Sequence, residues 1–310
     1  MADEVERMFY TGDMPWHGKG EGIDKAKTDP IFMSDVHTEP LYRAVEGLPE
    51  AVEAQCVIRN IDGKIMSHHV GPEWTPYQAR NAVAYFQGWE DQGLVTLETA
   101  GNLRGGSIQW ILARISKEPM VIGGDDIVRK YVLLTWGHGA MAVRNGFTPI
   151  RVVCMNTLSA SVADADSALI RVSHTKNVVQ NVENLREVMN LANQQFEATA
   201  EQYRYLASKE INTFDLHRYV KIITEAKVDL ETGATKDTPT SKKIIELFET
   251  GKGMDLKTAH GTWWGAYNAV SEYLTWGRGK DTSSRLENVW LGSGKALNKR
   301  ALETAVRMAA

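Results

Sequence analysis

The sequence predicts an α+β fold: a curved antiparallel β-sheet of hairpins with a packed helix, followed by a mainly helical C-terminal region. Two observations predict this class. Apolar segments of strand length, separated by turn residues, fill residues 54–176, and helical periodicity dominates residues 177–310. Residues 1–53 are rich in Gly and Pro and predict an irregular N-terminal arm. We therefore expect three parts: an arm (1–53), a β-rich core domain (54–176) and a helical region (177–310).

The β-rich part opens with a hairpin. Residues 54–59 and 64–70 flank the Asp62–Gly63 pair, which favours a tight turn. Thr75 and Pro76 then predict the start of a helix that runs to about residue 92. Further expected elements are a second hairpin with arms 94–100 and 107–115, strands at 130–136, 150–155 and 168–173, and a short helix at 158–165.

A heptad pattern indicates a long amphipathic helix after residue 177. Its apolar positions alternate in steps of four and three residues: Val178, Val182, Leu185, Met189, Ala192, Phe196, Thr199, Tyr203 and Leu206. The partner of this helix is either the same chain or another subunit. Shorter helices are expected at 213–226, 241–250, 262–275, 283–291 and 295–308.

The charges are unevenly distributed. The chain carries a net charge of −4, with −9 in residues 1–100, +4 in residues 101–160 and +1 in residues 161–310. A basic centre beside an acidic part can direct an electric field to one face. The acidic start has no secretory signal pattern, and no apolar run has the length of a membrane span. We expect a cytoplasmic protein that does not enter the membrane, with Cys56 and Cys154 as buried free thiols.

No catalytic motif is evident. The glycines around residues 101–106 and 123–124 lack the Lys-Ser/Thr pair of a phosphate loop, and the histidines show no metal-ligand spacing. We therefore expect no cofactor and no metal, and a binding protein rather than an enzyme. An enzyme with a non-obvious site around His138, His174 and Asn156 remains an alternative.

Cations beside turn and strand ends are the candidate nucleic-acid-binding residues. Guanidinium groups that converge on one surface would neutralise phosphates regardless of sequence, and aromatic rings would stack on bases. The alternative is structural: Arg104 satisfies turn carbonyls, and Trp110 fills the core. The candidate set is Arg104, Trp110, Arg144, Phe147, Arg151, Arg171, His174 and Lys176.

Several stretches together closely resemble the phage/plasmid-like protein family known as domain of unknown function 932. They are residues 14–20, 74–78, 98–106, 142–158, 171–175, 261–273 and 300–305. The resemblance implies a phage or plasmid protein from replication and recombination neighbourhoods, located in the cytoplasm of a bacterial host cell. At fold level the pattern is more loosely similar to the RecT/Erf/Red-beta single-strand annealing proteins, although those are often basic and this chain is net acidic.

These observations lead to one expected function and two alternatives. The expected function is single-stranded DNA binding and strand annealing by a homo-oligomeric ring or filament, with the heptad helix supplying the subunit contacts. The first alternative is a phage adaptor or inhibitor that binds a host protein through the acidic N-terminal part. A host or phage replication protein is a further expected partner. The second alternative is a nuclease-like enzyme.

Overall fold

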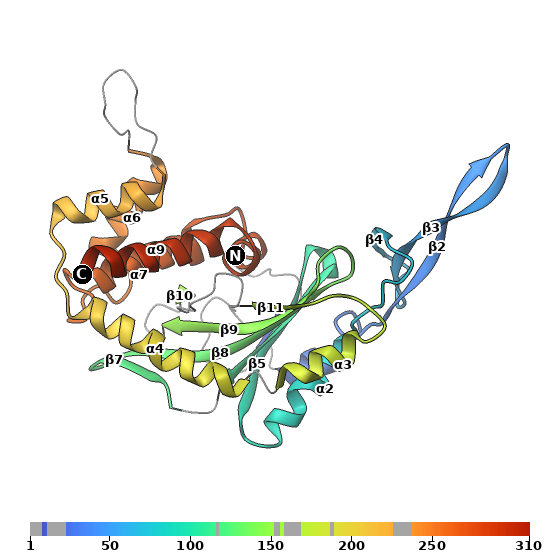
Figure 1. The fold of residues 1–310 in the computed structure, drawn as a ribbon, viewed down its shortest axis with the longest axis horizontal. Coiled ribbons are helices and arrows are strands. Elements are labelled where there is room, and N and C mark those ends of the chain that lie inside the picture. Colours follow the sequence, from blue (N-terminus) through green and yellow to red (C-terminus); the bar gives the residue numbers. More distant parts are fainter. Residues whose placement is uncertain are drawn as a thin grey trace. The chain divides into compact units, whose positions relative to one another are not determined.

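The computed structural model describes residues 8–10, 23–115, 118–151, 156–157, 169–186, 189–225 and 237–310 (Figure 1). The chain divides into two compact units. Unit 1 comprises Met1–Lys117, Tyr131–Phe147 and Asp166–Leu191, and unit 2 comprises Glu118–Lys130, Thr148–Ala165 and Ala192–Ala310. This division differs from the three consecutive parts that the sequence predicted, because each unit combines segments that lie far apart in the sequence.

The main sheet is antiparallel and built from hairpins, so the predicted α+β class is confirmed. Its strands follow the order β1-β5-β6-β8-β9-β10, with β7 paired to β8 and β11 paired to β9. The strands are β1 (Met8–Tyr10), β5 (Val95–Leu103), β6 (Ile108–Ile115), β7 (Met120–Gly123), β8 (Asp126–Gly137), β9 (Val143–Arg151), β10 (Asn156–Thr157) and β11 (Leu169–Val172).

Helices pack against the sheet within unit 1. Helix α2 (Ala79–Glu90) buries Ala82, Tyr85 and Phe86, which follow the three- and four-residue spacing of one helical face. The Asn145 amide of β9 donates a hydrogen bond to the Tyr85 hydroxyl (2.5 Å), so the Asn145 side of β9 faces α2. The helix starts three residues after Pro76, which had been predicted as its first residue. Helix α1 (Ile23–Thr28) follows β1 in the chain and contacts β1 and β5.

The first 53 residues are not irregular throughout, contrary to the prediction. β2 (Val36–Val45) and β3 (Leu48–Arg59) form a long hairpin, which β4 (Ile65–Val70) extends. Glu46 and Gly47 both have positive φ (49° and 83°), as a two-residue hairpin turn requires. Pro40 is tolerated because β2 is an edge strand, and Pro49 because β4 pairs with β3 only from Gln55 onward.

The predicted long heptad helix is divided in two. Val178–Glu183 forms α3, a 3₁₀ turn follows at Asn184–Arg186, and Met189–Ala207 forms α4. Every heptad position whose side chain is described is buried within this chain: Val178, Val182, Leu185, Phe196, Thr199, Tyr203 and Leu206. In unit 2, the Tyr203 ring lies 4.7 Å from that of Trp264. The described part of this pattern therefore packs inside the chain and is not available for subunit contacts.

The remaining predicted helices are present in unit 2. They are α5 (Thr213–Ile223), α6 (Pro239–Thr250), α7 (Trp263–Glu272) with a π-helical continuation at Tyr273–Gly277, α8 (Thr282–Leu291) and α9 (Ser293–Ala309). Hydroxyl or carboxylate side chains of Thr238, Thr262 and Asp281 accept backbone hydrogen bonds at the starts of α6, α7 and α8. The predicted helix at 158–165 lies outside the described residues, as does Cys154.

Candidate nucleic-acid interface

The central feature of the candidate site is a pair of arginines on neighbouring strands. β9 and β11 pair antiparallel with Arg144 directly opposite Arg171. Side chains of directly opposite residues project from the same face of a sheet. Because Asn145 points toward α2, strand alternation places both arginines on the other face. Two residues that are 27 positions apart in the sequence thus present like charges side by side.

No carboxylate compensates this pair within the described part of the chain. Arg144 is half-buried and Arg171 is exposed. The Nε of Arg144 is buried and has no hydrogen-bond partner among the described residues. Burial, and secondly the charge of Arg171, lower the pKa of the Arg144 guanidinium. Like charges directly opposite in a sheet destabilise it by up to about 1 kcal/mol. An anion bound between them would remove this repulsion and satisfy the buried donor.

Several other arginines differ from this pair because each has a carboxylate partner. Arg43 contacts Glu50 at 2.9 Å, Arg59 contacts Asp62 at 2.5 Å, and Arg114 contacts Glu98 at 2.5 Å. Arg80 and Arg300 form ion pairs with Asp35 and Glu225. Their charges are neutralised inside the chain. Arg144 and Arg171 are therefore the better-placed arginines for an external anion.

Reciprocal contacts fix the end of β11. The backbone N–H of Thr75 donates to the carbonyl of His174 (3.1 Å), and His174 Nδ1 donates to the carbonyl of Thr75 (2.9 Å). The His174 ring also stacks on Trp74 at 4.8 Å, and the Trp74 indole donates to the Gly139 carbonyl (3.1 Å). His174 is buried, so its role is to position the segment that carries Arg171. The sequence interpretation missed Trp74 as the partner of His174.

Lys176 and Arg104 are both exposed, but they lie at different places. Lys176 follows β11 by four residues and Arg171 by five. Arg104 lies in the β5–β6 turn, and β8 and β9 separate β6 from β11. Three strand spacings correspond to about 14 Å. Lys176 therefore lies close in sequence to the strand that carries Arg171, whereas Arg104 is part of a separate turn.

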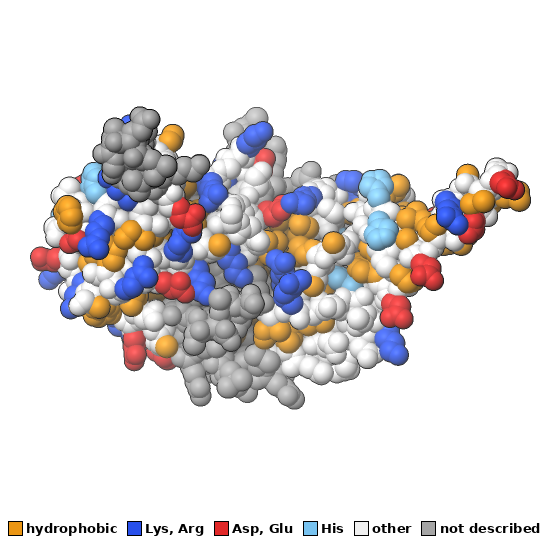
Figure 2. All heavy atoms as spheres, turned by 45° about the horizontal axis from the view of Figure 1, so that its top comes forward, with side chains coloured by type: hydrophobic (Ala, Val, Ile, Leu, Met, Phe, Trp, Pro, Cys, Tyr) orange, Lys and Arg blue, Asp and Glu red, His pale blue; other side chains and the backbone are white. Residues whose placement is uncertain are grey.

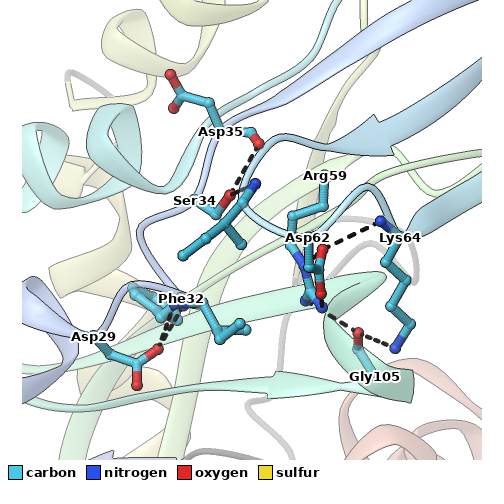
Figure 3. A network of polar contacts seen from close by, with 10 residues as sticks. Asp29, Phe32, Ser34, Asp35, Arg59, Asp62, Lys64 and Gly105 are labelled. Carbon is cyan, nitrogen blue, oxygen red and sulfur yellow. Dashed lines mark hydrogen bonds and ion pairs between the residues drawn. The ribbon is translucent and has the colours of Figure 1, made fainter.

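The Arg104 turn is itself firmly held (Figure 3). Lys64 Nζ donates to the Gly105 carbonyl at 2.9 Å, and Arg59 contacts the same oxygen at 3.4 Å. The Arg59 guanidinium holds the pKa of Asp62 at about 2. Gly106 has a φ of 92°, and a Cβ there would lie 2.7 Å from Arg59 Nη1. The turn at residues 104–106 thus requires both its glycine and its neighbouring cations.

Two of the three remaining candidates, Trp110 and Phe147, do not join the arginine pair. Trp110 is fully buried, so its indole fills the core and has no face open to a base; the structural alternative for Trp110 is confirmed. Phe147 is half-buried, and strand alternation places it on the face of β9 opposite to Arg144. Arg151 pairs through its backbone with Asn156, but its side chain lies outside the described part of the structure.

A buried polar network underlies this end of the unit 1 sheet. The Gln109 amide donates to the Phe32 carbonyl (2.8 Å) and to Asn102 Oδ1 (2.9 Å). Its oxygen accepts hydrogen bonds from the Trp136 indole and from His138 Nε2, both at 3.0 Å. Gln109 thus uses all four of its hydrogen-bonding positions. Burial, followed by the charges of His174 and Arg59, lowers the pKa of His138 to about 3.

The neutral His138 predicts a loss of stability in mild acid. An unfolded histidine has a pKa of about 6.5, so below that pH the unfolded chain binds a proton that the folded chain does not bind until about pH 3. The free energy of unfolding should therefore fall by about 2 kcal/mol between pH 6.5 and pH 5 through this group. Urea unfolding at both pH values measures it. The free energy of unfolding should depend less on pH in His138→Gln than in the wild type. An equal pH dependence in both proteins would contradict a neutral, buried His138.

Within the described residues, no three side chains of His, Cys, Asp or Glu lie close enough together to bind a metal ion. Nor does that part of the chain contain a helix with the length and apolarity needed to cross a membrane. The model of a family described as a domain of unknown function (DUF932) matches residues 67–299. No curated protein and no solved structure matches the chain.

Proposed function

Because the chain belongs to the DUF932 family, whose description names no activity, we propose a function from the site: it binds the phosphates of single-stranded DNA and promotes strand annealing. The observation that supports this proposal is the uncompensated pair of Arg144 and Arg171 on one face of the sheet. A guanidinium is a planar fork of donors that matches a phosphate bidentately. Two such groups on adjacent strands suit two successive anionic groups.

The placement of the aromatic residues favours annealing over binding by base stacking. Proteins that sequester single strands commonly stack bases on exposed aromatic rings. Of the predicted stacking residues, Trp110 and Trp136 are fully buried, and Phe147 is half-buried on the face of β9 opposite to Arg144. Contacts confined to phosphates leave the base edges free to pair with a complementary strand. Backbone contacts also carry no sequence information, as a general annealing protein requires.

A direct binding experiment tests this proposal. The anisotropy of a labelled 30-nucleotide single strand should rise on addition of the protein at about 50 mM salt, and binding should weaken steeply by about 200 mM. The protein should also accelerate pairing of two complementary oligonucleotides without any nucleotide cofactor. A chain that leaves the anisotropy unchanged even at low salt would contradict the proposal.

A further inference from the structure

The β2–β3 hairpin forms an exposed arm, which we define as residues 39–53. It projects beyond the rest of unit 1 (Figure 1). Almost every residue of the arm is exposed or half-buried, on both faces of the hairpin. The space-filling view shows hydrophobic and acidic side chains together along it (Figure 2). An isolated two-stranded hairpin is marginally stable in water, so an arm of this length requires support at its base or a partner.

The base of the arm is well supported. The Gln78 amide exchanges two hydrogen bonds with the backbone of Val36, at 3.0 and 2.8 Å. Val36 also belongs to a small apolar core with Val57, Met66 and Val70. These contacts hold the root of the arm on unit 1 and leave its outer part exposed. The outer part is therefore presented to solvent by a fixed base.

The outer part of the arm combines apolar and acidic groups. Val45 and Leu48 lie directly opposite each other beside the turn. Val45 is 40% exposed and Leu48 is 71% exposed. Tyr42, on the other face, is 61% exposed. The arm contains four glutamates and one arginine, a net charge of −3. Glu50 pairs with Arg43. The tip is thus apolar with an excess of negative charge.

Helix α5 in unit 2 carries the complementary features. Phe214 is 75% exposed and Ile222 is 40% exposed. Arg218 lies between them at four-residue spacing, so all three share one helical face, and Lys221 lies beside them. Neither Arg218 nor Lys221 has a carboxylate partner within the described residues. Phe214, Leu48 and Tyr42 are the most exposed large hydrophobic residues in the described part of the chain.

We propose that the arm of one copy docks on the α5 face of a second copy of this chain. Val45 and Leu48 would cover Phe214 and Ile222, and the excess carboxylates of the arm would lie near Arg218 and Lys221. Pairing of two identical arms is less favourable because each carries a net charge of −3. Since the arm and α5 are different surfaces, the contact is head-to-tail and repeats into a ring or filament.

This inference gives an interface for the homo-oligomer that the sequence analysis expected, and it does not depend on DNA binding. Two single-cysteine additions test it directly. Leu48→Cys and Phe214→Cys proteins, mixed and treated with a short bis-maleimide, should give a cross-linked dimer whose linked peptides contain residues 48 and 214. Neither protein alone should give this product. A mixture without the 48–214 product, or one that yields only 48–48 links, would overturn the proposal.

Oligomer mass provides the second test and separates the two proposals. Val45→Ser with Leu48→Ser should raise the dissociation constant for self-association by at least about tenfold. The matched control is Ile61→Ser, since Ile61 is 50% exposed but lies outside the arm. Glu46→Lys and Arg218→Glu should each weaken association, and their combination should restore part of it. A wild-type chain that is monomeric both in mass photometry and in light scattering at high concentration would overturn the inference. The affinity for a short oligonucleotide tests the DNA-binding proposal separately.

Discussion

Replacing both Arg144 and Arg171 with Gln should weaken single-stranded DNA binding by between about a hundredfold and ten-thousandfold at low salt. Each arginine is expected to make a charged hydrogen bond to phosphate, with a net value of about 1.5–3 kcal/mol, and tenfold in affinity corresponds to about 1.4 kcal/mol. Fluorescence anisotropy with a labelled oligonucleotide measures the change. The single Arg171→Gln variant should show an intermediate effect.

The control for this variant removes the same charge from arginines with internal partners. Arg80→Gln with Arg300→Gln also lowers the net charge by two, but the exposed Arg80 and the half-buried Arg300 are ion-paired with Asp35 and Glu225. Their loss should change DNA affinity little. The double variant at the site should also remain as stable as the wild type, because it removes two opposed like charges. Equal effects of both double variants on affinity would indicate a general charge effect and contradict a specific site.

Gln109→Leu should lower the free energy of unfolding by about 3–5 kcal/mol. The substitution removes all four hydrogen bonds of the buried amide and leaves the Trp136 indole, the His138 ring and the Phe32 carbonyl without this partner. An unsatisfied buried polar group costs about 1–3 kcal/mol, and partial relaxation reduces the sum. Such a loss is a large share of the free energy of unfolding of a typical domain, which is about 5–15 kcal/mol.

Chemical denaturation followed by tryptophan fluorescence measures this loss. Gln87→Leu is the matched control, because Gln87 is half-buried on α2 and pairs with Asp91 at the surface. It should change the free energy of unfolding by no more than about 0.5 kcal/mol. If Gln109→Leu lowered the free energy of unfolding as little as Gln87→Leu, the prediction would be wrong. Water or neighbouring groups would then satisfy the polar groups around Gln109, and the unit 1 core would not depend on this amide.

Local patterns predicted most of the secondary structure. The hairpins at 54–70 and 94–115 and the C-terminal helices appear where the sequence predicted them. Apolar residues repeat with the period of a strand or of a helix within each of these segments, so the signal is local. The β2–β3 arm was missed because Pro40 and Pro49 read as loop signals. Their tolerance depends on strand edges, which only the pairing of β2, β3 and β4 defines. The Glu46–Gly47 turn was the available sequence signal for this hairpin.

The candidate site was partly predictable. The sequence identified Arg144, Arg171 and Lys176, but it could not show that Arg144 lies opposite Arg171, since strand register between distant segments is a tertiary property. Nor could it separate a buried from an exposed tryptophan: alternation is uninformative in a strand buried on both faces, as β6 is around Trp110. The heptad pattern likewise identified buried positions but not the break after Glu183.

The salt dependence of DNA binding tests the central claim most directly, namely that Arg144 and Arg171 form an open site for phosphates. For a single strand, the logarithm of the binding constant falls with the logarithm of the salt concentration by about 0.7 for each phosphate neutralised. We predict that the slope for the Arg144→Gln, Arg171→Gln protein is smaller in magnitude than the wild-type slope by about 1.4, which corresponds to two lost contacts. Identical slopes and affinities for the two proteins would contradict the account, because the arginine pair would then contact no phosphate.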